Sequence, residues 1–210
     1  MAHTTQPSSS TADKLLDAAA RLFAQRGIEN VSAAEVVRAA GQRNASAVIY
    51  HFGTRDDLLH AVLAREIPTL ARRRRELLER AHADGEVRSA AEAIVRPVTE
   101  FAQLGWRERA YLQIGSDVLG MLDRTTPEIR ALLHETAGYE AWDLLRARAS
   151  GIESEVWSER QDIGVVMIGR AAADRARKLE QGGEHPVLSD DRFVSNLVDM
   201  VVGAMTAPES

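Results

Sequence analysis

The stretch over residues 31–52 predicts two short helices joined by a tight turn. Ser32 and Glu35 form the pattern of a capping box, in which each side chain hydrogen-bonds the backbone amide of the other residue. Gly41 stands where a helix commonly ends on a left-handed residue, and Asn44 can cap the helix that follows. Such a pair is a helix-turn-helix, which occurs in DNA-binding proteins and also as an ordinary helical hairpin.

The second helix of the pair, predicted over residues 45–51, has two unlike sides. The side that would pack on neighbouring helices carries Ala45, Val48 and Phe52. The opposite side carries small, polar or phenolic residues, namely Ser46, Ala47 and Tyr50. A surface of this kind can fit closely against a partner, as a helix in the major groove of DNA must.

The composition limits the class of protein. The chain has 210 residues, of which 45% are hydrophobic and 27% charged, and this suits one or two globular domains. It contains no Cys, which excludes disulfides, thiolate nucleophiles and Cys-ligated metals. The chain contains no run of about 18 apolar residues, so we expect no membrane span. We therefore expect an all-α cytoplasmic protein with a polar, disordered arm at residues 1–10.

Charge is distributed unevenly along the chain. The net charge is −5, yet residues 1–80 carry 12 Lys and Arg against 9 Asp and Glu, whereas residues 81–210 carry 14 against 22. The first part can therefore approach an anionic partner while the acidic remainder faces away. The four consecutive arginines at 72–75 have acidic neighbours at Glu66, Glu76 and Glu79, which favours a solvated helix surface over a nucleic-acid site.

Helical spacing of apolar residues continues along the chain. Thr11 can cap a first helix, and Thr54 can cap a fourth, which Pro68 must kink or restart. The helices expected outside the helix-turn-helix lie at 12–25, 54–83, 89–104, 106–121, 127–149, 155–181 and 190–205. The chain then divides into a helix-turn-helix domain at 11–53, a connecting helix at 54–84 and a larger helical domain at 85–210.

Several spaced motifs together resemble the N-terminal domain of the tetracycline-repressor (TetR) family of transcriptional regulators. They are Leu22-Phe23-Ala24-Gln25-Arg26-Gly27-Ile28, Val31-Ser32, Ala39-Ala40-Gly41 and Tyr50-His51-Phe52-Gly53-Thr54-Arg55-Asp56-Asp57-Leu58-Leu59. The resemblance covers about residues 11–63, and the segment from Gly41 to Phe52 is one residue longer than is usual in the family. It implies a homodimer that binds an operator in double-stranded DNA and responds to a small-molecule effector, most often as a repressor.

The resemblance also implies roles for matching positions. Ser46 and Ala47 would face bases, where small side chains permit contact with a thymine methyl group. Phosphates would be met by Tyr50, His51, Thr54 and Arg55; His51 has the alternative role of a packed residue at a helix end. Arg43 is added on chemical grounds, because a guanidinium can reach guanine or phosphate. The full set expected at DNA is Arg43, Asn44, Ala45, Ser46, Ala47, Tyr50, His51, Thr54 and Arg55.

The last two helices have apolar residues on more than one face and need cover on more than one side. In the family, the last two helices pair with those of a second subunit, which implies a dimer interface here. The residues expected in it are Ile163, Met167, Ile168, Phe193, Leu197 and Val201. The alternative is that these helices lie at the centre of a single subunit.

Rings with polar tips occur along the middle helices, and such rings can line a pocket for a mostly apolar ligand. They are Trp106, Tyr111, His134, Tyr139 and Trp142, each of which can equally be a core residue. The chain shows no metal-binding, nucleotide-binding or nucleophile-elbow motif, so we expect no enzyme activity, cofactor or metal. The alternatives to a ligand-responsive repressor are a DNA-packaging protein without an effector and a helical enzyme.

Overall fold

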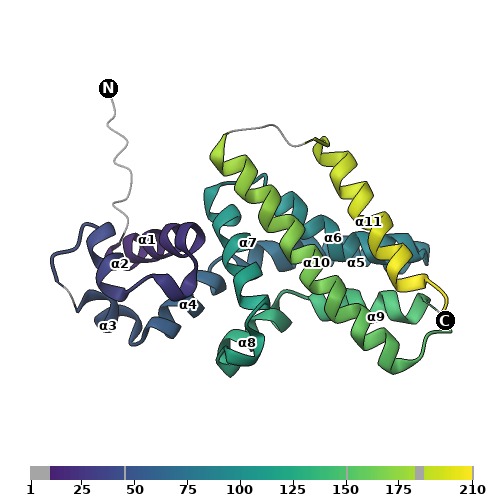
Figure 1. Ribbon diagram of the computed structural model, residues 1–210, viewed down its shortest axis with the longest axis horizontal. Coiled ribbons are helices and arrows are strands. Elements are labelled where there is room, and N and C mark those ends of the chain that lie inside the picture. Colours follow the sequence, from purple (N-terminus) through teal and green to yellow (C-terminus); the bar gives the residue numbers. More distant parts are fainter. Residues whose placement is uncertain (1–9, 45, 150, 183–186, 210) are drawn as a thin grey trace.

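The computed structural model describes residues 10–44, 46–149, 151–182 and 187–209. A small head of four helices lies at one end, and a larger helical body forms the rest (Figure 1). Helices and turns, without a strand, make up this described part, as the sequence predicts. Residues 1–9 of the expected N-terminal arm lie outside it.

The head contains α1 (Thr11–Arg26), a 3₁₀ turn (Ile28–Asn30), α2 (Ala33–Ala39), α3 (Ala47–Phe52) and α4 (Arg55–Ala64). Ser10 rather than Thr11 caps α1, because its hydroxyl accepts from the Asp13 amide while the Asp13 carboxylate accepts from the Ser10 amide. The predicted capping box of Ser32 and Glu35 opens α2 in the same way. Each box satisfies backbone donors that a helix start would otherwise leave unpaired.

The turn between α2 and α3 confirms the expected role of Gly41. Its φ is +68°, in the left-handed region, and the amides of Gly41 and Gln42 donate to the carbonyls of Arg38 and Val37. This is the hydrogen-bond pattern of a Schellman motif, which ends a helix and redirects the chain. The turn therefore aims α3 away from α2 without leaving α2's last carbonyls unsatisfied.

The predicted fourth helix is two helices. α4 ends at Ala64, and α5 runs over Ile67–Asp84 with Pro68 in its first turn. Pro68 thus restarts the helix, as a residue without an amide donor can at this position. Arg65 and Glu66 form the joint between the two helices, and Arg65 also pairs with Asp17 of α1 at 2.9 Å.

The body contains α6 (Val87–Phe101), α7 (Trp106–Leu119), a 3₁₀ turn (Leu122–Arg124), α8 (Pro127–Glu135), α9 (Gly138–Arg148), α10 (Ser154–Gln181) and α11 (Asp190–Thr206). The predicted capping box at Ser89 is wrong: α6 starts at Val87, and the Ser89 hydroxyl instead donates to Asp84 at 2.6 Å. The single helix predicted at 127–149 is also wrong, because Ala137, with φ of +57°, separates α8 from α9.

Two hydrophobic cores hold the chain together. One joins the head to the body, since residues such as Leu15 and Leu58 cluster with Ile114 of α7 and Ile129 of α8. The other lies between α5, α6, α9, α10 and α11 and includes Trp142, Trp157 and Leu197. The head is therefore packed on α7, and Asp17 of α1 reinforces this contact by accepting from Arg107.

The second core corrects the expected dimer interface. Ile168, Leu197 and Val201 are at most 4% exposed and pack inside the subunit. Met167 and Phe193 are half-buried, whereas Ile163 is 66% exposed. Helical spacing identified the apolar helices but did not show which side each turns inward, because both sides of α10 and α11 carry apolar residues.

No helix in the described part of the chain is both long and apolar enough to cross a membrane.

Candidate DNA-binding surface and ligand cavity

The outward face of α3, formed by Ser46, Ile49 and Tyr50, is the most exposed apolar and aromatic surface of the head. Val48, on the opposite side, is 1% exposed and anchors α3 in the first core. Ile49 is 67% exposed and Tyr50 is 83% exposed. A buried anchor behind an exposed aromatic side chain leaves the helix rigid and its outer side chains available for a partner.

Ala47 lies on the other side from the one we expected. It is 6% exposed and belongs to the first core, so it cannot present its methyl group to a base without leaving that core. The exposed residue on the outward face is Ile49, which the helical wheel had not singled out. The difference arises because Ala47 and Val48 both pack against the core, so the buried side of α3 lies between these two positions.

The residues before α3 line the approach to its exposed face. Arg43 and Asn44 are exposed, and the Asn44 side-chain oxygen accepts from the Ser46 amide at 3.0 Å. Asn44 thus shapes the start of α3, although Ser46 rather than Asn44 is the residue before the first helical position. Ala45 falls outside the described residues.

The end of α3 carries an aromatic pair. The Tyr50 and His51 rings meet edge to face with their centroids 5.0 Å apart, and both side chains are exposed. The alternative of a packed, buried His51 is therefore not what the structure shows. Both residues can reach an external hydrogen-bond acceptor such as a phosphate oxygen.

The start of α4 is already occupied by a carboxylate. The Thr54 hydroxyl and amide both donate to Asp57, at 2.6 and 2.9 Å. These hydrogen bonds lower the pKa of the Asp57 carboxyl below its usual value, and the bond from the Thr54 hydroxyl has the larger effect. An anion at this helix start compensates the same amide groups that a phosphate would use, so the expected phosphate contact at Thr54 would have to share them.

Arg55 points into the head. Its Nε donates to the Val31 carbonyl at 2.9 Å, its Nη2 donates to the Ile28 carbonyl, and the guanidinium carbon lies 5.8 Å from the centre of the Phe23 ring. The side chain therefore links α4 to the connection between α1 and α2. We reassign Arg55 from an expected phosphate contact to a residue that holds the head together.

The body contains a partly open cavity of about 220 Å³ between α5, α6, α7, α9 and α10. Its wall is mainly apolar and contains Leu70, Ile94, Val98, Leu112, Leu119, Val165 and Ile168, and its polar residues include Arg74, Ser116, Thr136, Gln161 and Asp162. An apolar recess with a few polar groups is the usual form of a small-molecule site. Gly164 and Gly169 let α10 approach closely, because a Cβ at either would lie 2.8 Å from Trp142 or 2.7 Å from Leu119.

Three of the five expected pocket residues line this cavity, namely Tyr111, Tyr139 and Trp142. His134 is exposed and stacks on the Tyr139 ring at 4.0 Å. Trp106 lies elsewhere: it faces a separate hollow between α1, α7 and α10, where the Arg21 guanidinium stacks over its ring at 3.7 Å. Sequence reasoning missed Arg74, whose place in a run of four arginines suggested a solvated residue.

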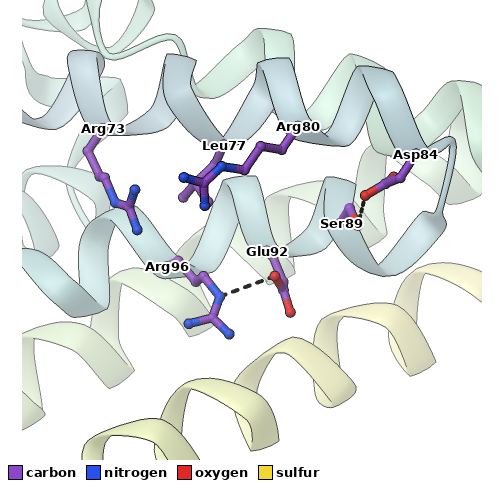
Figure 2. Close-up of a pocket in the computed structure, with 7 residues that line it drawn as sticks. All are labelled: Arg73, Leu77, Arg80, Asp84, Ser89, Glu92 and Arg96. Atoms are coloured by element: carbon purple, nitrogen blue, oxygen red, sulfur yellow. Dashed lines mark hydrogen bonds and ion pairs between the residues drawn. The ribbon is translucent and has the colours of Figure 1, made fainter.

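A third hollow lies between α5 and α6 and is lined by cations and carboxylates (Figure 2). Arg96 pairs with Glu92 at 3.2 Å, and Arg73 pairs with Glu100 at 2.6 Å. These two cations have carboxylate partners, whereas Arg80, which also lines the hollow, has no ion pair among the described residues. In the described part of the chain, no group of three or more His, Asp or Glu side chains could hold a metal ion.

Residues 15–62, which include the whole helix-turn-helix, match the model of a family described as bacterial regulatory proteins, tetR family. No curated protein sequence matches the chain.

Solved structures share the fold along almost the whole chain. A TetR-family transcriptional regulator from Bordetella parapertussis 12822 is 16% identical with a TM-score of 0.62, covering 92% of this chain and 94% of its own. A bacterial regulatory protein in the tetR family from Rhodococcus RHA1 is 13% identical with a TM-score of 0.62, covering 96% and 100%. The superantigen PfiT is 23% identical with a TM-score of 0.52, covering 93% and 97%. Because a protein described as a superantigen shares the fold, the fold alone does not assign a function to this chain.

Proposed function

We propose that this chain, which has the N-terminal domain of the tetR family of bacterial regulatory proteins and the fold of its members, is a sequence-specific repressor that a small, mainly apolar effector releases from DNA. The outward face of α3 carries this proposal, because Ile49 and Tyr50 are exposed to solvent on a helix whose other side is buried. A short helix that presents such a face suits the major groove.

The exposed residues of this face and those beside it have distinct roles in the proposal. Ser46 and Ile49 meet base edges, where the Ile49 side chain can contact a thymine methyl group. Tyr50, His51 and Arg43 meet phosphates, which position the head but carry no sequence information. Because a bacterial operator lies in the cytoplasm, the proposed repressor acts there.

Two heads must be held together to read a near-palindromic operator, so we propose a two-fold dimer through the outward faces of α10 and α11. Three exposed apolar side chains support this interface: Ile163 at 66%, Val166 at 52% and Met200 at 48% exposure. Apolar residues in water at regular positions on two neighbouring helices favour burial against a second copy.

Charged substitutions separate the interface from the core. Val166→Asp should give folded monomers in sedimentation, because it places a charge in the interface, whereas Leu197→Asp should unfold the subunit from within. Val187→Asp is the matched control, since Val187 is fully exposed and lies on neither helix. A wild-type protein that sediments as a folded monomer at micromolar concentration contradicts the proposed dimer.

The release of DNA requires that the effector prefer the state whose heads are wrongly spaced. α7 supports such a coupling, because Tyr111 and Leu112 line the cavity while the same helix packs on α1 of the head. An effector that widens the cavity can therefore move the head through α7 as well as through the joint at Glu66. A hundredfold preference for the DNA-incompetent state supplies about 2.7 kcal/mol.

The DNA-binding part is tested by selecting duplexes from a random pool and measuring affinity across salt concentrations. We expect specific binding that weakens steeply with salt, since phosphate contacts release counterions. Ser46→Gln should change the preferred bases, whereas Tyr50→Phe should weaken every duplex alike by removing a phosphate contact. Val187→Ala, at a fully exposed position outside the head and outside the cavity, is the control.

Equal affinity for selected and random duplexes would instead support the DNA-packaging alternative. A regulator without an effector would show selected binding that no cavity ligand alters. These outcomes distinguish a DNA-packaging protein and an effector-independent regulator from the proposed effector-responsive repressor.

A further inference from the structure

Arg74 of α5 is set apart from the other arginines of its run. Arg72 and Arg73 lie at the surface and pair with Glu76. Figure 2 shows Arg73 at the edge of the hollow between α5 and α6. Arg74 is 5% exposed and lines the wall of the apolar cavity instead. One turn of helix thus contains a solvated, paired cation and a buried one.

The buried guanidinium lacks an anion. Its Nη1 donates to the Thr136 carbonyl at 2.6 Å, and its Nε is a buried donor without a hydrogen-bond partner. Among the described residues, no carboxylate lies within ion-pair distance of it. Burial lowers the pKa of Arg74 to about 10, so the group is still charged at neutral pH.

An unpaired buried guanidinium such as that of Arg74 lowers the stability of the fold. A buried charge is normally paired, because its removal from water is compensated only by an opposite charge and further hydrogen bonds. The other polar residues of the cavity wall, such as Ser116 and Gln161, carry no charge, and Asp162 on α10 is exposed. The cavity therefore has one buried cation in a mainly apolar lining, and its carboxylate, Asp162, is exposed to solvent.

We propose that the effector is an amphipathic carboxylate, whose anionic head pairs with Arg74 and whose apolar body fills the cavity between Tyr111, Trp142 and Ile168. This inference rests on the proposed effector site and names the chemical class of its ligand. One guanidinium matches the single charge of a carboxylate and can bind it through two parallel hydrogen bonds. A phosphate monoester would carry further charge without a second buried cation to meet it.

The size of the cavity limits the apolar body. Ligand pockets typically measure about 300–1,000 Å³, and the 220 Å³ here lies below that range. A straight chain of medium length or a single substituted ring fits this space better than a large fused-ring compound. Tyr111, whose buried hydroxyl keeps its proton because its pKa is raised to about 12, is a second donor on the same wall.

The test is calorimetric titration of the full-length protein with three probes that share one chain: octanoate, octanol and octylamine. We expect octanoate to bind at least tenfold more tightly than octanol, and octylamine to bind most weakly, because only the carboxylate pairs with Arg74. Arg74→Met should weaken octanoate at least tenfold while octanol keeps its affinity. Arg75→Met is the matched control, since Arg75 is the exposed neighbour on the same helix.

A second measurement distinguishes a ligand-binding role from a purely structural one. If Arg74 served only to hold the Thr136 carbonyl, Arg74→Met would lower the melting temperature of the free protein. If Arg74 instead binds an anionic ligand and is unpaired in the free protein, Arg74→Met should leave that temperature unchanged or raise it, because an unpaired buried charge is removed. Octanoate should then raise the melting temperature of the wild type but not that of Arg74→Met.

Three results overturn the proposal: equal affinity for octanoate and octanol, an Arg74→Met variant that binds octanoate as the wild type does, or no binding of any straight-chain carboxylate from six to twelve carbons or of any singly substituted benzoate. None of them depends on DNA. A protein that binds its selected duplex but fails these titrations keeps its regulatory role and loses only the carboxylate effector.

Discussion

Substituting Arg55 with Met should weaken the head without removing a DNA contact. The guanidinium donates to the carbonyls of Ile28 and Val31, and it is half-buried beside Phe23. Met keeps much of the apolar stem but leaves two carbonyls without their donors. The change therefore acts on the connection between α1 and α2, which sets the position of the helix-turn-helix.

The size of the effect follows from these two hydrogen bonds. A hydrogen bond that involves a charged group contributes about 1.5–3 kcal/mol, and partial exposure places this pair toward the lower end. Two such bonds at the lower end give about 3 kcal/mol, which is the loss in free energy of unfolding that we expect for Arg55→Met. Urea unfolding, followed by circular dichroism, measures this loss directly.

The salt dependence of DNA binding separates this role from a phosphate contact. Each phosphate contact contributes about 0.9 to the slope of log affinity against log salt. Arg55→Met should leave the slope unchanged at temperatures where the protein is folded, whereas Arg43→Met, on an exposed arginine before α3, should reduce it. A reduced slope for Arg55→Met together with unchanged stability would refute the structural role.

Three further predictions concern stability. Gly164→Ala should lower the free energy of unfolding by about 1–3 kcal/mol, because its Cβ would lie 2.8 Å from Trp142, whereas Gly115→Ala, with open space around it, should stabilise by about 0.5–1 kcal/mol in urea unfolding. Ala137→Gly should stabilise by about 1 kcal/mol in the same assay, because the left-handed φ of +57° strains an alanine but not a glycine. The lowered pKa of Asp57 predicts that its contribution is complete above its usual value of 3.8 and is lost as pH falls through the lower folded-state value; melting temperatures between about pH 5 and pH 2.5 should fall less steeply for Asp57→Asn than for the wild type.

Local hydrogen-bond patterns made the head predictable from sequence. The capping box at Ser32, the cap at Thr54 and the left-handed Gly41 each depend on residues within five positions, and all three form as expected. The one-residue error at Ser10 has the same local character, since a Ser and a Thr stand next to each other and either can cap. Short-range chemistry of this kind can be read directly from the order of residues.

The features that sequence reasoning missed depend on distant contacts. The helix predicted over 127–149 is interrupted at Ala137, whose φ is +57°, and at this break the Thr136 carbonyl accepts from Arg74, far earlier in the chain. The inward turn of Ile168 and Leu197 depends likewise on how α10 and α11 are rotated in the second core. No window of neighbouring residues contains this information.

The shared core between the head and α7 has a consequence for protein engineering. The matched segment ends at residue 62, but the apolar contacts of α1 continue onto α7, and Asp17 accepts from Arg107 across the same boundary. A chimera that joins this head to a foreign body at that point would expose part of its hydrophobic surface and leave Asp17 without Arg107. An exchange of operator specificity between such proteins is therefore better made by grafting the outward residues of α3 than by transplanting the head.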